Sequence, residues 1–385
     1  MRSGRSLCGS LTDVRFFVRN RYFPNRRTLR QKSIKGRVKM GKYILKRIGY
    51  MLIVLFILSF LMFILYTAAA GDRAYVKAYE EIKSIKNLTA DQRQKLFDET
   101  YFKYQCQYGT EKNNKIVHYL RWMGLYPYYN GNFNGLLEGN FGYSDFYRTD
   151  VINVVKEPMK NTIFINVFAT ILALAITIPL GIRCAVKRGK LGDKTMQVLT
   201  IIGYSLPTFL ISIIFIWIFC SLLGWLPPYG MGTPGGQYTG MKWFLDRAYY
   251  LILPLAVMTF CSLGGMTRYV RASMIDALSM DCIKTARAKG LREKTIIYSH
   301  AWRNALIPIV TLVVGWFLSI FSGSVVIEQI FAINGMGKIM ITALQSGDND
   351  VILLMQMFYV IIALGGNLVI DIIYGLVDPR VRVNK

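Results

Sequence analysis

The feature that most constrains the fold is a series of apolar stretches, each about twenty residues long. The first, residues 48–70, has 23 residues and no charged side chain. A helix of about twenty apolar residues crosses the hydrocarbon core of a bilayer. Hydrophobic residues make up 53% of the 385-residue chain, but their clustering decides the class. The sequence therefore predicts an all-α, multi-pass membrane protein embedded in a lipid bilayer.

Five further spans are expected. They lie near residues 162–182, 196–223, 248–266, 305–327 and 351–377. Within these spans, Pro179, Pro207 and Pro254 each free a backbone carbonyl, which needs another hydrogen-bond partner. Gly264-Gly265 and Gly365-Gly366 allow helices to approach closely. Any one of these residues is explained by packing, but together they indicate a bundle that changes shape, with Pro207 as a candidate gating position.

Lys and Arg are concentrated in alternate segments between the spans. Segments 183–195, 268–304 and 378–385 hold sixteen Lys/Arg, whereas 224–247 and 331–350 hold three. Short cytoplasmic segments are rich in Lys and Arg, so the first group is expected inside. Both termini of a six-span chain are then cytoplasmic. The net charge of +25 accordingly indicates membrane orientation and not a nucleic-acid partner.

Residues 1–47 form a basic cytoplasmic tail with fifteen Lys/Arg and one Asp. Two interpretations remain for residues 1–39. They are a disordered tail, or they precede the true translation start at Met40, whose short basic sequence leads directly into the first span.

Residues 71–160 are expected to form an enlarged extracytoplasmic loop domain between the first two spans. They carry thirteen Lys/Arg and eleven Asp/Glu, a balance that suits an aqueous domain. Residues 78–97 have helix-like spacing, whereas residues 126–147 are rich in Gly, Asn and Tyr and predict turns. For residues 71–135, contact with another protein outside the membrane and a purely structural cap remain open.

No cofactor or metal is expected. Only Cys106 lies in the segment placed outside, so no external disulfide forms within the chain. The sequence has no Cys-x-x-Cys, and its two histidines are far apart, which disfavours zinc. Residues 36–43 have phosphate-loop spacing but carry Tyr43 in place of Ser or Thr, and residues 230–235 match a dinucleotide motif without its strand and helix. The chain is expected not to be an enzyme.

The charged segment, residues 268–304, separates two apolar spans and holds eight Lys/Arg against three Asp/Glu. It is far longer than a turn requires. Asp281 is expected to cap a short helix that ends at Gly290. Ile283, Ala286 and Gly290 share one narrow face of this helix. From spacing alone, two interpretations remain: the helix docks in a groove of another protein, or it lies on anionic headgroups.

The charged segment resembles the EAA loop of permease subunits of ABC transporters. Thr285-Ala-Arg-Ala-Lys-Gly290-Leu291, followed by His300-Ala-Trp-Arg-Asn-Ala-Leu-Ile-Pro308, is similar to the dipeptide/oligopeptide and nickel import branch. Other similar segments are 137–144, 178–181, 205–209, 223–227, 326–337 and 378–380. The general Glu-Ala-Ala pattern falls on Lys284, Thr285 and Ala286, so two of its three positions depart from it.

The resemblance implies the type I ABC importer permease fold with six transmembrane helices in the cell membrane. The residues 161–385 would be the permease core, with five of the helices. The resemblance also implies that one short helix couples to the ATPase. That coupling helix would comprise Asp281, Ile283, Lys284, Thr285, Ala286, Arg287, Ala288, Lys289 and Gly290. The implied partners are a second homologous permease, two ABC ATPase subunits and an extracytoplasmic peptide-binding protein.

The implied function is ATP-driven import of di- or oligopeptides, with this chain forming half of the translocation pathway. Within the family, nickel or another small solute is the alternative substrate. From a different class, a secondary transporter driven by an ion gradient would show coupling-ion carboxylates within its spans. Asp371 is the only Asp or Glu well inside an expected span. A peptide-export permease is a third alternative.

Polar residues within spans are candidates for the translocation pathway or its gate. Asn367 and Asp371 lie four apart on the last span and so share a face. Glu328 lies at the outer end of the fifth span. The resemblance favours helix–helix hydrogen bonding over substrate contact for these three. Asn161 and Asn166, at the entry to the second span, are weaker candidates.

Overall fold

A computed structural model describes residues 26–69, 71–86, 89–112 and 114–377. The chain divides into two units, Met1–Val54 and Leu55–Lys385. Helix α2 (Arg26–Ala69) begins in the first unit and ends in the second. It starts within the tail for which disorder is one interpretation, and the Arg, Lys, Gln and Leu residues there favour helix. The expectations for residues 1–25 and 378–385 lie outside the described residues.

The segment between α2 and the next long helix is called the insert, residues 71–150. Its elements are α3 (Arg73–Lys83), α4 (Ala90–Tyr108), α5 (Lys115–Met123), the short helical turn Leu136–Glu138, and the antiparallel strands β1 (Tyr143–Ser144) and β2 (Thr149–Asp150). The predicted helical stretch 78–97 is therefore two helices. Asp72 caps α3 by accepting a hydrogen bond from the Tyr75 amide, and Thr89 begins α4 with a capping box.

The rest of the second unit is a helix bundle. Its elements are α6 (Val151–Val186), α7 (Leu191–Ser205), α8 (Thr208–Ile216), the π-helix Trp217–Leu222, α9 (Gly240–Ser279), α10 (Asp281–Ala288), α11 (Glu293–Thr295), the π-helix Ile296–Ala301, α12 (Trp302–Ser319), α13 (Val325–Ile330), α14 (Met336–Ser346) and α15 (Asn349–Val377). Helix α6 begins before the expected residue 162 because the apolar residues Val151, Val154 and Val155 already pack into a core.

Four helical stretches among the described residues are long and apolar enough to cross a bilayer, and there are six if two bent helix pairs each count as one span. The four are Ile44–Lys83, Val151–Val186, Gly240–Ser279 and Asn349–Ile372. The bent pairs are Leu191–Ser205 with Thr208–Leu222, at 107°, and Glu293–Leu306 with Pro308–Ser319, at 61°. The structure thus accommodates the six predicted spans only with two of them broken.

Two expected spans differ in form from the prediction. The span expected at 196–223 bends at Leu206-Pro207, because proline cannot donate the helical hydrogen bond and keeps the preceding residue extended. The span expected at 305–327 ends at Ser319, and α13 is a separate helix. The intervening Gly323 lies so close to Gly337 that a Cβ there would be 2.2 Å from the Gly337 nitrogen.

One glycine of each predicted pair lies at a tight helix contact. A Cβ on Gly264 of α9 would lie 2.6 Å from the Thr200 carbonyl oxygen of α7. A Cβ on Gly366 of α15 would lie 2.3 Å from Leu318 of α12. Gly265 and Gly365, by contrast, have open space. The close approach predicted from sequence therefore applies to the α7–α9 and α12–α15 contacts.

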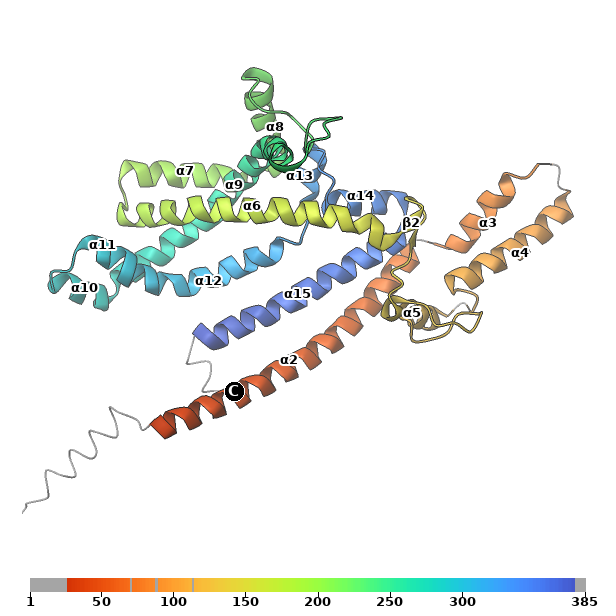
Figure 1. The fold of residues 1–385 in the computed structure, drawn as a ribbon, viewed down its shortest axis with the longest axis horizontal. Helices are drawn as coiled ribbons and strands as arrows, with labels where there is room; N and C mark the ends of the chain where they lie inside the picture. The colour runs from red at the N-terminus through yellow and green to blue at the C-terminus, as the bar shows by residue number, and fades with distance from the viewer. Residues whose placement is uncertain (1–25, 70, 87–88, 113, 378–385) are drawn as a thin grey trace, which may run out of the picture. The chain divides into compact units, whose positions relative to one another are not determined.

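Helix α6 links two distinct ends of the second unit (Figure 1). Its C-terminal residues Ile182 and Ala185 share a core with α9, α10 and α12, whereas Val151 and Val154 share one with α14 and α15. Its 36 residues correspond to about 54 Å at 1.5 Å per residue. This exceeds the ~30 Å hydrocarbon thickness of a bilayer, so α6 is long enough to place its two ends at opposite membrane surfaces.

Candidate functional site

The charged segment presents α10 as a short helix seated on the bundle. Ile283 is fully buried and Ala286 is 6% exposed. They pack in one core with Met274, Ala277, Ile296, Ala301 and Ala305, which belong to α9, the π-helix Ile296–Ala301 and α12. This apolar contact fixes the orientation of α10 on the ends of two long helices.

The buried face of α10 is the face that spacing alone offered to a partner. Ile283 and Ala286 anchor the helix within this chain, so they are not available at its surface. Lys284, Thr285 and Lys289 are exposed instead. A partner that reaches α10 therefore meets a polar, basic surface with small residues between the cations.

Both ends of α10 are defined by backbone geometry. Met280 occupies the N-cap position without a side-chain hydrogen bond, so Asp281 is the first helical residue and not the expected cap. Its carboxylate still lies in the first turn, where the helix dipole favours negative charge. Gly290 ends the helix as predicted: with φ of +71°, its amide donates to Arg287 O (2.9 Å), and the Leu291 amide donates to Ala286 O (3.3 Å), which is a Schellman motif.

The cations around α10 differ in how they are paired. Arg287 Nε lies 2.8 Å from Glu293 Oε1, and Lys284 Nζ lies 2.8 Å from Asp281 Oδ1. In the described part of the chain, no ion pair involves Lys289, Arg292 or Lys294, which are all exposed. These three side chains give the charged segment a positive surface that can meet an acidic partner.

An ion pair between a half-buried arginine and a buried carboxylate, which sequence reasoning did not single out, joins the start of the charged segment to α7. Arg271 of α9 holds Asp193 of α7 through Nε–Oδ1 (2.6 Å) and Nη2–Oδ2 (2.8 Å) contacts. Asp193 also accepts a hydrogen bond from the Gly189 amide at 2.9 Å. The Asp193 side chain has no exposed surface. The only sequence signal was that both charges lie at ends of apolar stretches.

Glu328 is buried in a polar cluster at the other end of the bundle. It is 4% exposed, and its carboxylate accepts hydrogen bonds from Thr162 Oγ1 (2.9 Å) and the Lys338 amide (2.9 Å). Thr162 in turn accepts from the Met336 amide at 2.8 Å. A Cβ on Gly335 would lie 2.4 Å from the Glu328 carboxyl carbon. This arrangement joins α6, α13 and α14.

The two asparagines at the start of the second span also join helices. Asn161 Nδ2 donates to Asn334 O at 2.8 Å. Asn166 Nδ2 donates to Ile320 O (2.8 Å) and to Ser322 O (3.0 Å). Both amides thereby satisfy carbonyls in the connections after α12, so each joins α6 to a later segment of the bundle.

The remaining pathway candidates lie elsewhere in the bundle. Asn367 is exposed on α15, and Asp371, one turn later, is partly buried. Pro207 lies at the 107° bend between α7 and α8. The structure therefore does not bring Glu328, Asn367, Asp371 and Pro207 into one site: Glu328 belongs to the α6–α13–α14 cluster, and Asn367 presents a polar group on the outside of a long apolar helix.

Comparison with known families gives one matching description for the bundle. Residues 177–383 match the family described as the inner membrane component of binding-protein-dependent transport systems. The match covers the charged segment and the helices on both sides of it.

Curated relatives cover more of the chain. The oligopeptide transport system permease protein AppB of Bacillus subtilis is 33% identical over 344 residues, which is 89% of this chain and 100% of the relative. A probable peptide ABC transporter permease protein of Sinorhizobium fredii is 29% identical over 89% of this chain and all of its own length. The oligopeptide permease protein OppB of Haemophilus influenzae is 30% identical over 67% of this chain and 81% of its own length.

Proposed function

Because this chain belongs to the family of inner membrane components of binding-protein-dependent transport systems, we propose that it imports di- or oligopeptides as the permease subunit of an ABC transporter. The chain is a multi-pass membrane transporter subunit and not an enzyme. The names of the relatives from Bacillus subtilis and Haemophilus influenzae support the substrate class. A second homologous permease would complete the pathway, and two ATPase subunits and an extracytoplasmic peptide-binding protein would complete the transporter.

The single observation that carries the coupling role is the two-sided character of α10. Ile283 and Ala286 fix one face to the ends of α9 and α12, while Lys284, Thr285 and Lys289 remain exposed on the other. An ATPase that binds the exposed face of α10 therefore moves α10 together with the ends of α9 and α12 as one rigid body. Its closure then shifts the long helices and biases the bundle between two packings.

The orientation follows from charge. The charged segment and residues 183–195 meet at the C-terminal end of α6 and carry most of the Lys and Arg of the short connections. The positive-inside rule assigns this end to the cytoplasm. The insert at the other end of α6 is then extracytoplasmic, and both termini are cytoplasmic.

The pathway candidates acquire different roles in this proposal. Glu328 with Thr162 holds the outer connections together, and Pro207 provides a bend at which α7 and α8 change their angle. Asn367 has an exposed amide on an apolar helix, and an amide facing lipid is costly. We assign Asn367 to the pathway or to the contact with the second permease.

The test is co-purification of the ATPase subunits with the full permease complex, together with uptake of radiolabelled trialanine. Thr285→Trp places a bulky side chain on the exposed face of α10. Thr239→Trp is the matched control, since Thr239 is also exposed but precedes the opposite end of α9. We expect Thr285→Trp to lose both the ATPase and uptake, and Thr239→Trp to keep both.

Three results would contradict the proposal. Equal ATPase retention by the two variants would remove α10 from the interface. Peptide uptake in membranes without any ATPase subunit would assign the chain to gradient-driven transport. Saturable nickel uptake without trialanine uptake would replace the substrate class.

A further inference from the structure

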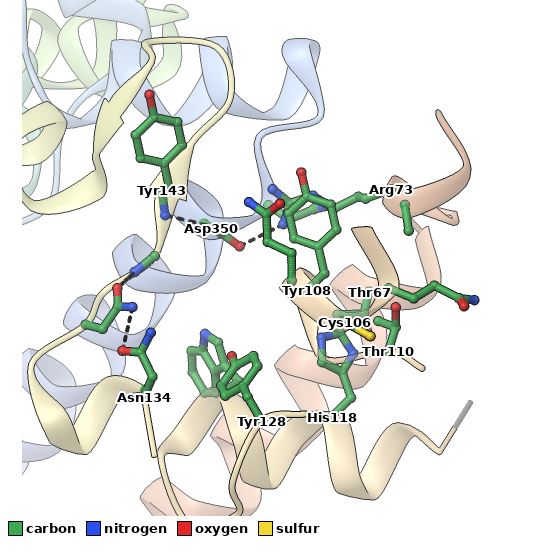
Figure 2. Close-up of a pocket in the computed structure, with 18 of the residues that line it drawn as sticks. Thr67, Arg73, Cys106, Tyr108, Thr110, His118, Tyr128, Asn134, Tyr143 and Asp350 are labelled. Atoms are coloured by element: carbon green, nitrogen blue, oxygen red, sulfur yellow. Dashed lines mark hydrogen bonds and ion pairs between the residues drawn. The ribbon is translucent and has the colours of Figure 1, made fainter. Parts of the chain in front are cut away.

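The insert and the start of α15 enclose a cavity of ≈ 1230 Å³ (Figure 2). Its wall includes the end of α2, parts of α4 and α5, the loop after α5, and the first residues of α15. Cavities that hold small molecules commonly measure about 300–1,000 Å³. This one has room for an extended ligand larger than a single amino acid.

Side-chain amides dominate the polar part of the wall. Six asparagines line the cavity: Asn114, Asn130, Asn132, Asn134, Asn140 and Asn349. Each amide side chain carries both donors and an acceptor, as does each peptide unit of a polypeptide backbone. Such a wall can pair with main-chain groups of a peptide without selecting its side chains.

Aromatic side chains supply the apolar part of the wall. Tyr108, Trp122, Tyr128 and Tyr143 all line the cavity, and Figure 2 places Tyr108, Tyr128 and Tyr143 around it. Burial raises the pKa of Tyr108 to about 12, so its hydroxyl stays neutral. Tyrosine and tryptophan offer large apolar surfaces with a polar tip, which suits ligands whose side chains vary.

The charge of the wall is acidic. Asp72, Asp145, Asp150 and Asp350 line the cavity, against Arg73 and Lys115. Arg73 is already engaged: its Nη1 lies 2.8 Å from Asp350 Oδ1, and its Nη2 lies 3.0 Å from Asp145 Oδ2. Lys77 Nζ also lies 3.3 Å from Asp145 Oδ1. Asp72 and Asp150 are therefore the wall carboxylates without an ion pair among the described residues, and they favour a ligand that carries an ammonium group.

Two polar groups in the wall lack a partner within the described residues. Asn349 is 6% exposed and its Nδ2 makes no hydrogen bond there, and Thr110 Oγ1 is likewise buried without a partner. Buried polar groups in proteins are nearly always hydrogen-bonded. Thr110 Oγ1 and Asn349 Nδ2 have almost no accessible surface in this conformation, so a rotation of either side chain is needed to bring its unpaired group to a molecule in the cavity.

We propose that this cavity is a binding site for the amino-terminal part of a peptide, with the acidic wall holding the ammonium group and the asparagines pairing with the backbone. The substrate class rests on the proposed function. Asn349 and Asp350 are the first residues of α15, the helix that also carries Asn367 and Asp371. A peptide bound here would touch the end of the helix that carries Asn367, which is assigned to the pathway or to the contact with the second permease.

The test measures binding of fluorescently detected tetra-alanine to the full-length permease in lipid nanodiscs, without ATPase or binding protein. We expect saturable binding of tetra-alanine and at least tenfold weaker binding of N-acetyl-tetra-alanine and of maltotetraose. Asn349→Leu and, separately, Thr110→Val should each weaken tetra-alanine binding, by about tenfold for Asn349→Leu, which corresponds to ~1.4 kcal/mol. Gln94→Leu, on the exposed side of α4, is the matched control and should bind as the unaltered chain does.

Thr110→Val keeps the test decisive if Asn349→Leu fails to fold. Its folding is checked by its elution volume and melting temperature, which should equal those of the unaltered chain. The proposal is overturned if tetra-alanine does not bind saturably, if maltotetraose or the acetylated peptide binds equally well, or if folded Thr110→Val binds as tightly as the unaltered chain. Because no ATPase is present, these outcomes are separate from those of the Thr285→Trp experiment. Peptide uptake with no binding in nanodiscs would reject the cavity alone.

Discussion

The two ends of α6 differ in the residues that surround them and in the kind of ligand that they suit. At its C-terminal end, an apolar core supports a short helix whose polar face is open and basic. At its N-terminal end, ion pairs and hydrogen bonds tie the insert to α15 around a hollow, amide-rich space. A convex, rigidly mounted helix suits a macromolecular partner, whereas a polar cavity suits a small, flexible ligand. Helix α6 connects the two.

Removing the side chain that anchors α10 should cause the largest loss of stability. Ile283→Ala removes a fully buried side chain and should destabilise the bundle by about 2–4 kcal/mol through lost burial and a residual cavity. Lys284→Ala, one position away and exposed, should change stability by less than about 0.5 kcal/mol. The measurement is the thermal unfolding midpoint of both variants in the same detergent. Equal midpoints would show that α10 is not anchored through Ile283.

The second prediction concerns acid sensitivity of the insert. Burial, opposed by the nearby Asp350 and reinforced by Arg73 and Arg121, lowers the pKa of His118 to about 4. The unfolded chain takes up this proton near pH 6.5, so the unfolded state binds more protons between pH 6.5 and 4. Above pH 6.5, His118 is neutral in both states and costs no stability. As the pH falls from 6.5 to 4, the free energy of unfolding decreases, by at most about 3 kcal/mol.

Hydrogen exchange of the α5 amides at pH 7, 5.5 and 4.5 measures this effect. We expect the unaltered chain to lose protection on acidification and His118→Gln to lose less. Helix α10 packs in a different core from α5, so exchange in α10 should not share this dependence. A parallel loss in the α5 amides of His118→Gln would assign the sensitivity to other groups.

The third prediction concerns the ion pairs of Arg73, which join the insert to α15. Arg73→Met keeps the apolar stem but removes the contacts to Asp145 and Asp350. Since all three groups are partly exposed, the expected cost is about 1–2 kcal/mol. Limited proteolysis should then cleave the insert faster, while the charged segment keeps its cleavage rate. Lys95→Met, on the exposed surface of α4, is the control and should leave both rates unchanged.

The smallest expected effect on stability comes from the surface of the charged segment. Lys289→Ala should change the free energy of unfolding by less than about 0.5 kcal/mol yet weaken retention of the ATPase. Because the contact is electrostatic, the difference from the unaltered complex should shrink as salt increases. A salt-independent difference in retention would mean that charge at Lys289 does not contribute to the interface.

The sequence predicted the membrane class, the approximate place of the four unbroken candidate spans and the stop at Gly290, because apolar run length and a glycine after a helix are local signals. It did not predict which face of α10 is free. Ile283 and Ala286 looked like a docking face, and only the fold shows that α9 and α12 already cover them.

The polar contacts were less predictable. Glu328 and Thr162 are 166 residues apart in the chain, and Arg73 and Asp350 are 277 apart. Nothing in the local sequence of either pair marks its partner. Of the three prolines that the sequence analysis named, Pro207 lies at a break, whereas α6 and α9 continue through Pro179 and Pro254. The break at Pro308 was not predicted. The cavity joins residues from four separate segments, so the Asn-rich composition of the insert hinted at its chemistry but not at its existence.

Site-specific photo-crosslinking in membranes that contain the whole transporter shows whether α10 contacts the ATPase. A photoreactive amino acid in place of Thr285, on the exposed face of α10, is compared with the same residue in place of Tyr129, which is exposed on the insert. If α10 lies in the ATPase interface, we expect an ATPase adduct from position 285 and none from position 129. Adducts from position 285 with lipid alone, in every nucleotide state, would contradict it.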